Sequence, residues 1–301
     1  MSSVPRISFL GANRAAQTRL RAAFARVERS NERVATGKSY NRPSENEVSA
    51  ARAALLRDQL DELATFGRAV DDSRSRLATA DAVVQQAGNL YHRITELATQ
   101  AATSTTSPAA RSSIADEIHQ LQAELVSIAN TQYQGKSIFA GLQSGLAVTY
   151  DVSTSDWVFN GSATERIRRR IAPGEVIDAS MTAGELFSSV GNDIFKTLDD
   201  LQSALTGNDT AGIQASLGRV TELRSTLSAG QARLGAMLNR VENAADRNSV
   251  GFAAVTSELS QIEDVDLGDA ITDQNRLSVA YQAALGVTAK ANQQTLLDWW
   301  R

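Results

Sequence analysis

The stretch LATADAVVQQAGNLYHRITELATQA, residues 77–101, decides the fold of this chain. Its apolar residues recur at alternating spacings of three and four, which is the a and d seam of a coiled coil. We therefore expect one helix from about residue 44 to 104, about 90 Å long at about 1.5 Å per residue, and hence a rod. The seam residues are Leu77, Ala80, Val84, Ala87, Tyr91, Ile94, Ala98 and Ala101, with a weaker continuation upstream through Leu56, Leu63, Phe66 and Val70.

The start of this helix is marked by Pro43 and the residues after it. Ser44 is the candidate N-cap, and Glu47 stands three residues later, as a capping box requires. The pattern predicts a helix that begins directly after Ser44.

Further helices are expected on the C-terminal side. A short loop around Pro108 leads to a second heptad pattern, which predicts a helix antiparallel to the first. No proline follows Pro173, so we expect nearly continuous helix from about Thr182, with one turn at 206–212. Asn248 lies in the C-terminal seam, where it either fixes the register or marks a solvent-facing slip. The two seams are Ile114, Ile118, Leu121, Leu125 and Ile128, and Leu234, Leu238, Val241, Ala245, Asn248, Phe252, Val255, Leu259 and Ile262.

Between residues 135 and 181 the pattern changes to β-branched and aromatic residues with turn signals. The run ERIRRRI, residues 165–171, predicts an edge strand with Ile167, Arg169 and Ile171 on one face. Arg166, Arg168 and Arg170 form a charged solvent face, which resists aggregation. A basic nucleic-acid patch is the alternative interpretation of this run.

The composition excludes several classes of function. The chain has 301 residues, no cysteine and a net charge of −4. Disulfides and thiolate metal sites are therefore excluded, and nucleic acid is not an expected partner. No run of about 18 apolar residues exists, so we expect no membrane insertion. The N-terminus lacks the apolar core of a signal peptide, so any export takes another route.

No motif for catalysis or cofactor binding is recognisable. Gly37-Lys38-Ser39 and Gly135-Lys136-Ser137 end like phosphate-binding loops, but Glu32 and Asn130 occupy the positions of the required first glycine. His92 and His119 each stand alone on a predicted helix, and the acidic run 263–273 does not match a calcium loop. We therefore expect no enzyme, no catalytic, cofactor-binding or metal-binding residues and no cofactor, but a part of an assembly.

Three stretches carry a family resemblance: RVATGKSYNRPSENEVSAARAALLRDQL (33–60), ARLGAMLNRVENA (232–244) and IEDVDLGDAIT (262–272). They resemble the flagellin superfamily, although Ser44-Glu45-Asn46 replaces its usual aspartates. The resemblance implies a mainly α, elongated flagellin-like rod of long coiled-coil helices from both chain ends, with a small β-containing insert. The expected divisions are an N-terminal axial segment (1–42), an N-terminal rod (43–134), the insert (135–181), a C-terminal rod (182–264) and a C-terminal axial segment (265–301).

Two motifs favour the hook-associated protein 3 branch, which forms the junction between hook and filament. LLDWW (296–300) is similar to the end of that branch, whereas flagellin usually ends in a block around a proline, absent here. YQGKSIFAG (133–141) resembles its GxYIFAG signature, with a strand-like run at Ile138–Ala140 and the motif residues Gly135, Ile138, Phe139, Ala140 and Gly141. Flagellin itself remains an alternative. A soluble coiled-coil adaptor or signalling protein is another, but it does not explain the insert.

Both chain ends carry apolar helix faces that cannot be buried by one helix alone. The resemblance implies that they pair only in an assembled tube of copies, stay disordered in the monomer, and pass through the flagellar type III export apparatus to the extracellular flagellum. The implied partners are its own copies in a ring or tube, hook-associated protein 1, flagellin and an export chaperone. Trp299 and Trp300 are assigned to the chaperone or to neighbouring subunits, or else they staple the final turn. The predicted assembly residues are Leu20, Phe24, Val27, Val34, Leu277, Tyr281, Leu285, Leu296 and Leu297.

Overall fold

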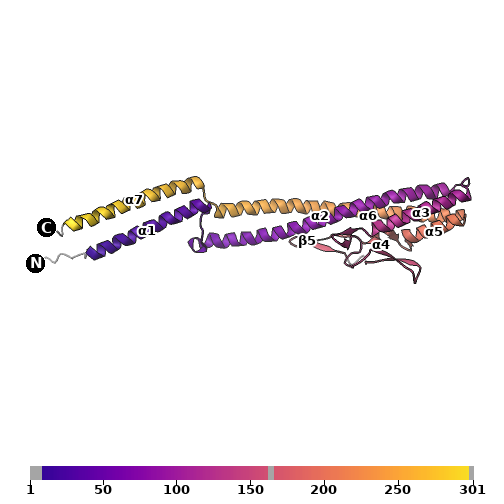
Figure 1. Cartoon of the computed structure of the whole chain (residues 1–301), viewed down its shortest axis with the longest axis horizontal. Coiled ribbons are helices and arrows are strands. Elements are labelled where there is room, and N and C mark those ends of the chain that lie inside the picture. Colours follow the sequence, from indigo (N-terminus) through magenta and orange to yellow (C-terminus); the bar gives the residue numbers. More distant parts are fainter. Residues whose placement is uncertain (1–8, 162–165, 298–301) are drawn as a thin grey trace. The chain divides into compact units, whose positions relative to one another are not determined.

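The computed structural model describes residues 9–161 and 166–297, and its chain divides into two compact units. The terminal unit comprises Met1–Glu62 and Phe252–Arg301, and the central unit comprises Leu63–Gly251. The mainly α fold with long helices from both chain ends is confirmed (Figure 1). In the described ranges the α-helices are α1 (Phe9–Thr36), α2 (Glu47–Ala102), α3 (Pro108–Ala129), α4 (Ala183–Phe187), α5 (Ile194–Thr206), α6 (Thr210–Glu263) and α7 (Leu267–Leu297).

The predicted seam of α2 forms the core of the central unit. All eight residues from Leu77 to Ala101 are buried, none of them more than 3% exposed. Helix α6 runs antiparallel to α2, because Arg74 pairs with Glu242 and His92 lies beside Arg224. The amide of Asn248 donates a 3.0 Å hydrogen bond to the carbonyl of Leu63, so this residue links the two helices rather than facing solvent.

The start of α2 differs from the prediction. Pro43–Glu45 form a short 3-10 turn, and the α-helix begins only at Glu47. The side chain of Asn46 accepts a 3.1 Å hydrogen bond from the backbone N–H of Ser49, which makes Asn46 the N-cap. The Ser44 cap is therefore wrong. The 3-10 turn moves the first free helical N–H groups beyond the reach of its hydroxyl.

Helix α3 returns along α2, as the short loop predicts. Ser107 caps α3 by accepting from the N–H of Ala110. The buried guanidinium of Arg111 donates to the carbonyl oxygens of Ala101 and Thr103, at 3.1 and 3.2 Å. The Ala101 carbonyl lies in the last turn of α2, and the Thr103 carbonyl, just after the helix, also accepts from the N–H of Thr106. Arg111 therefore closes the connection between α2 and α3. Of the predicted α3 seam, only Leu121 is half-buried instead of buried.

The insert consists of antiparallel hairpins along one side of the long helices of the central unit (Figure 1). The strand-like run expected at Ile138–Ala140 is wrong, because pairing stops at Ser137 and a turn follows. Helix does begin near Thr182, which caps α4, but two strands interrupt it before α5. The pairs are β1 (Gln132–Tyr133) with β2 (Lys136–Ser137), β3 (Val148–Asp151) with β4 (Asp156–Phe159), β5 (Arg168–Ala172) with β6 (Glu175–Asp178), and β7 (Ser188–Ser189) with β8 (Asn192–Asp193).

The arginines around β5 do not form a plain solvent face. Arg166 pairs with Asp178 at 3.0 Å and with Glu185. Arg169 reaches Asp72 of α2 at 3.4 Å, and the guanidinium carbon of Arg170 lies 5.5 Å from the centroid of the Phe66 ring. A register shift between Arg170 and Ala172 breaks the strict alternation on which the prediction relied. Arg169 and Arg170 therefore fasten the hairpin to α2, whereas Arg166 links β6 to α4.

A second interruption was not predicted. Helix α6 ends at Glu263 and α7 begins at Leu267, so three residues separate two long helices. Asp266 caps α7 by accepting from the N–H groups of Gly268 and Asp269, at 2.8 and 3.2 Å. The helices of residues 9–161 and 166–297 include none that is both long and apolar enough to cross a membrane.

Candidate functional site

Helices α1 and α7, from opposite ends of the chain, lie side by side in the terminal unit (Figure 1). The ring centroids of Phe24 and Tyr281 are 5.7 Å apart. The side chain of Gln274 donates to that of Asn31 at 3.2 Å. These two contacts set an antiparallel register, so the chain ends pair with each other as a two-helix coiled coil.

This pair buries very few of its own side chains. Among residues 14–36 of the α1 segment only Ser30 is buried, and between Leu267 and Lys290 of α7 only Ala270 is buried. The predicted interface residues Phe24 and Leu285 are 49% and 40% exposed. The others with described side chains, all half-buried, are Leu20, Val27, Val34, Leu277 and Tyr281. The side chains of Leu296 and Leu297, and all of Trp299 and Trp300, lie outside the described residues.

A backbone clasp joins the end of α1 to the break between α6 and α7. Gly37, at φ +68°, stops α1 in the left-handed conformation that glycine adopts without strain. Its carbonyl accepts a 2.9 Å hydrogen bond from the N–H of Val265. The N–H of Ser39 donates at 2.6 Å to the carbonyl of Glu263, and Lys38 and Asp264 form an isolated antiparallel bridge between these bonds. Two segments more than 200 residues apart are therefore held together.

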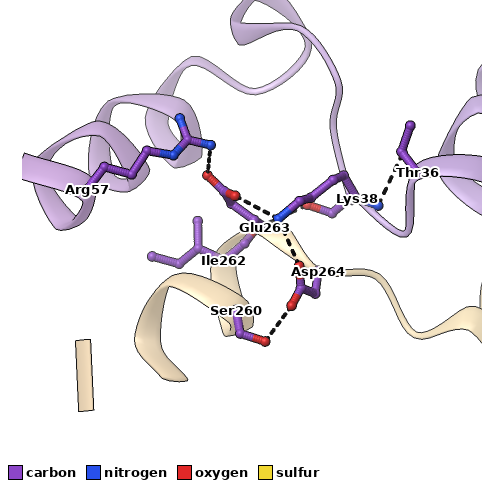
Figure 2. A network of polar contacts seen from close by, with 8 residues as sticks. Thr36, Lys38, Arg57, Ser260, Ile262, Glu263 and Asp264 are labelled. Atoms are coloured by element: carbon purple, nitrogen blue, oxygen red, sulfur yellow. Dashed lines mark hydrogen bonds and ion pairs between the residues drawn. The ribbon is translucent and has the colours of Figure 1, made fainter. Parts of the chain in front are cut away.

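Charged side chains surround the same clasp (Figure 2). The carboxylate of Glu263 is only 5% exposed, and it accepts from Lys38 at 2.9 Å and from Arg57 of α2. The ammonium of Lys38 also contacts Asp264 at 3.1 Å, and the hydroxyl of Ser260 donates to the other oxygen of Asp264. A buried carboxylate held by two cations draws three elements together at one point.

The same contacts shift two pKa values. Hydrogen bonds to Glu263 and Asp264 raise the pKa of Lys38 above its ordinary value. Hydrogen bonds from Ser260 and Lys38 lower the pKa of Asp264. Both shifts favour the charged forms, so Lys38 and Asp264 carry opposite charges at neutral pH. Lys38 contacts two carboxylates, those of Glu263 and Asp264. The Gly37-Lys38-Ser39 sequence therefore attaches the end of α1 to the end of α6.

The family motif anchors the insert. Ile138, Phe139 and Ala140 are at most 1% exposed. The guanidinium of Arg76 in α2 donates to the carbonyl of Ile138 at 3.3 Å, and the N–H of Ala183 donates to that of Phe139 at 2.9 Å. The flanking glycines Gly135 and Gly141 both have positive φ, +76° and +63°. The motif residues therefore fasten the insert to α2 and to the start of α4.

Sequence reasoning did not identify the clasp residues Lys38, Arg57, Glu263 and Asp264 as a site. A signal was present in the lysine after Gly37 and in the acidic pair that ends α6. The separation along the chain hid their relation. In the described ranges no group of three or more histidine, aspartate or glutamate residues is arranged to hold a metal ion.

Comparison with known proteins extends this picture. The model of the bacterial flagellin N-terminal helical region matches residues 7–144, and that of the C-terminal helical region matches residues 217–299. The flagellin of Bacillus subtilis is 28% identical over 282 residues, covering 87% of this chain and 88% of the relative. Flagellar hook-associated protein 3 of Escherichia coli is 24% identical over 287 residues, covering 84% and 87%.

Among solved structures, a putative flagellar hook-associated protein from Vibrio parahaemolyticus has the same fold. The TM-score is 0.68 at 16% identity, and the match covers 73% of this chain and all of that one. The helical regions at both chain ends agree with the two family models. The chain belongs to the flagellin superfamily of bacterial flagellar proteins.

Proposed function

We propose that this chain is a structural subunit of the bacterial flagellum that forms the junction between hook and filament. The observation that carries the proposal is the α1–α7 pair. Its two helices contact each other but leave apolar side chains such as Phe24 and Leu285 close to half exposed. Residues of this kind at the ends of a chain are expected to be buried by neighbouring copies.

The choice of the junction over the filament rests on two supports. The solved fold with a TM-score of 0.68 belongs to a putative hook-associated protein. The motif from Gly135 to Gly141 and the LLDWW end at 296–300 resemble the hook-associated protein 3 branch. The 28% identity with a flagellin favours the second candidate, a subunit of the filament itself.

In the proposed role the protein acts outside the cell as a structural component and not as an enzyme. The segments 1–42 and 265–301 form the axial core, 43–134 and 182–264 form the rod, and the insert 135–181 faces outward. Copies assemble in a ring or tube, with hook-associated protein 1 on one side and flagellin on the other. The chain leaves the cell through the flagellar export apparatus, with Trp299 and Trp300 presented to an export chaperone.

Labelling the protein in intact flagella distinguishes the two candidates. An epitope tag in the turn between β3 and β4, which is solvent-exposed, is detected with gold-conjugated antibody in electron micrographs. The junction role predicts one band of gold where the hook ends and, in a deletion strain, bare hooks with flagellin in the medium. Gold along the whole filament identifies a flagellin instead. Normal filaments in the deletion strain contradict both roles.

A further inference from the structure

Three arginines form a single row on α1. Arg19, Arg26 and Arg33 are spaced by seven residues, so they lie above one another on the helix surface, and all three are exposed. Within the described residues none of them forms an ion pair within 4 Å. The parallel row of Arg14, Arg21 and Glu28 differs, because it ends in the opposite charge. The chain as a whole is acidic, at −4, which makes an unmixed basic row notable.

The row lies at the edge of the α1–α7 contact, directly before the half-buried Val27 and Val34. Such edge positions usually pair with opposite charges on the facing helix of a coiled coil. Opposite Arg19 and Arg26, α7 offers none, whereas Arg33 is level with Thr272, next to Asp273. The register set by Phe24 and Tyr281 places Val279 level with Arg26 and Gly286 level with Arg19. The sequence of α7 contains no acidic residue between Leu277 and Ala289.

The acidic residues of α7 are gathered instead at its start. Asp266, the N-cap just before the helix, and Asp269 and Asp273 within it are spaced by three and four residues, and all are exposed. Asp269 has no ion pair in the described chain, and Asp273 contacts only Arg276 of its own helix, at 3.1 Å. Asp266 and Asp273 are seven residues apart, which is the spacing of Arg19 and Arg26. Asp266 and Asp273 therefore match Arg19 and Arg26 in spacing but lie at a different height along the α1–α7 pair.

We propose that the arginine row of α1 binds the aspartate row of α7 in a second copy of the chain. Arg19 then faces Asp273 and Arg26 faces Asp266 of the neighbour. Within one chain Gly286 lies level with Arg19, whereas in the proposed contact Asp273 of the neighbour takes that place. The two positions are about 20 Å apart at about 1.5 Å per residue, so the neighbour is shifted by that distance along the helix axis. Because the two surfaces differ, the contact repeats from copy to copy and builds rings or helical tubes. The inference rests on the proposed function only in requiring that copies assemble.

Cysteine cross-linking tests the contact directly, since the natural chain contains no cysteine. The variant carries Arg19→Cys and Asp273→Cys in one chain, and isolated flagella are oxidised and run without reductant. Within one chain these positions are about 20 Å apart along the pair, far beyond the reach of about 7 Å that a disulfide allows. We expect dimers and higher ladders. The control carries Arg21→Cys with Asp273→Cys, on the other side of α1, and stays monomeric. No cross-link, or equal cross-linking in the control, overturns the proposal.

Charge exchange tests the same contact without cross-links. Removing two exposed ion pairs and adding repulsion weakens each contact by about tenfold, so Arg19→Glu with Arg26→Glu reduces the number of filamented cells. Adding Asp273→Lys, the proposed partner of position 19, restores part of it, while Asp266, the proposed partner of position 26, is left in place because it caps α7. The matched control, Arg14→Glu with Arg21→Glu, has little effect. Loss in both double variants without rescue overturns the proposal and points to another acidic partner, such as a chaperone or an anionic membrane.

The two proposals fail in different ways. Gold labelling along the filament contradicts the junction role, but the cross-link between positions 19 and 273 still forms between copies. A single band at the junction without that cross-link leaves the junction role intact and refutes the staggered contact. Absence of the protein from flagella refutes both.

Discussion

The helix pairs of the two units share a heptad pattern of apolar residues, but they bury very different fractions of those side chains. In the central unit the seam from Leu77 to Ala101 is buried along its whole length. In the terminal unit, α1 and α7 each bury a single described side chain. The central seam packs with α3, α5 and the insert as well as with α6, whereas in the described residues α1 and α7 chiefly contact each other. A heptad pattern therefore predicts that helices pair, while the number of further neighbours decides how deeply the seam is buried.

The difference has an energetic consequence. Full burial of a leucine-sized side chain contributes about 1.5–3 kcal/mol, and the central unit gains this at many positions of its seam. The α1–α7 pair gains only part of this at each position, while it still loses the conformational entropy of two long helices. We therefore expect the central unit to be folded in the monomer and the terminal pair to need neighbouring copies.

Substitution of one leucine in each unit should give the largest difference in unfolding free energy. Leu77 is fully buried, so Leu77→Ala lowers the free energy of unfolding of the monomer by about 2–5 kcal/mol. Leu277 is half-buried in the terminal pair, so Leu277→Ala costs less than about 1 kcal/mol in the monomer but impairs assembly. Urea unfolding followed by circular dichroism measures both. Equal losses in the monomer would mean that the terminal pair is as well packed as the central seam.

The clasp predicts a smaller, local effect. Glu263→Gln keeps the shape of the side chain but removes the charge that holds Lys38 and Arg57. Both cations stay partly exposed, so the loss is about 1–2 kcal/mol rather than that of a fully buried pair. Faster hydrogen exchange at the amides of Ser39 and Val265 reports it.

The matched control for this change is Glu258→Gln, because Glu258 contacts Arg52 at an exposed site. It costs about 0–1 kcal/mol and leaves the exchange of Ser39 and Val265 unchanged. If Glu258→Gln accelerates exchange at these amides as much as Glu263→Gln does, then the overall charge of the region, and not the specific contacts of Glu263, holds residues 37–39 and 263–265 together.

A glycine pair separates backbone strain from packing. Gly37→Ala forces alanine into a left-handed conformation and costs about 1 kcal/mol, although nothing lies within 4 Å of the new methyl group. Gly88 has equal space in the ordinary backbone of α2, so Gly88→Ala stabilises by about 0.4–1 kcal/mol. Thermal unfolding and exchange at Val265 detect the two opposite changes. The same sign for both substitutions would contradict the assigned role of Gly37 in ending α1.

The smallest expected effect is the response of the clasp to pH. The pKa of Asp264 is lowered from 3.8, so its contribution is present above that value and is lost as pH falls through the lower folded pKa. The pKa of Lys38 is raised from 10.5, so its contribution is complete below that value and disappears as pH rises through the higher folded pKa. Exchange protection of Val265, corrected for intrinsic rates, should be flat between these limits. A step near neutral pH would show that another group controls the clasp.

Much of the fold could be predicted because it follows from local patterns. The spacing of Leu77 to Ala101 identified the buried stripe of α2, and the same reasoning identified α3 and much of α6. The cap of α2 was misplaced because both Ser44 and Asn46 are capping residues, and only the 3-10 turn decides between them. Periodicity also missed the end of α6, since the acidic residues after Ile262 resemble one more polar turn of helix.

The candidate site was harder to predict because it depends on contacts between distant segments. Lys38 and Glu263 meet only after the whole chain has folded, and no spacing rule connects them. Arg170 was assigned to the solvent face and Arg169 to the opposite face, and their partners Phe66 and Asp72 could not be foreseen because both lie on α2. The apolar faces of the chain ends were visible in the sequence, but whether they suffice for a stable pair is a question of burial.

Hydrogen exchange measured on the purified monomer and on isolated flagella tests the central claim most directly. Residues 14–36 and 267–290 should exchange rapidly in the monomer and slowly in flagella, while residues 77–101 should exchange slowly in both. The reason is that neighbouring copies supply the burial that α1 and α7 lack. Terminal helices as strongly protected in the monomer as residues 77–101 would show that the pair is stable alone and contradict the account.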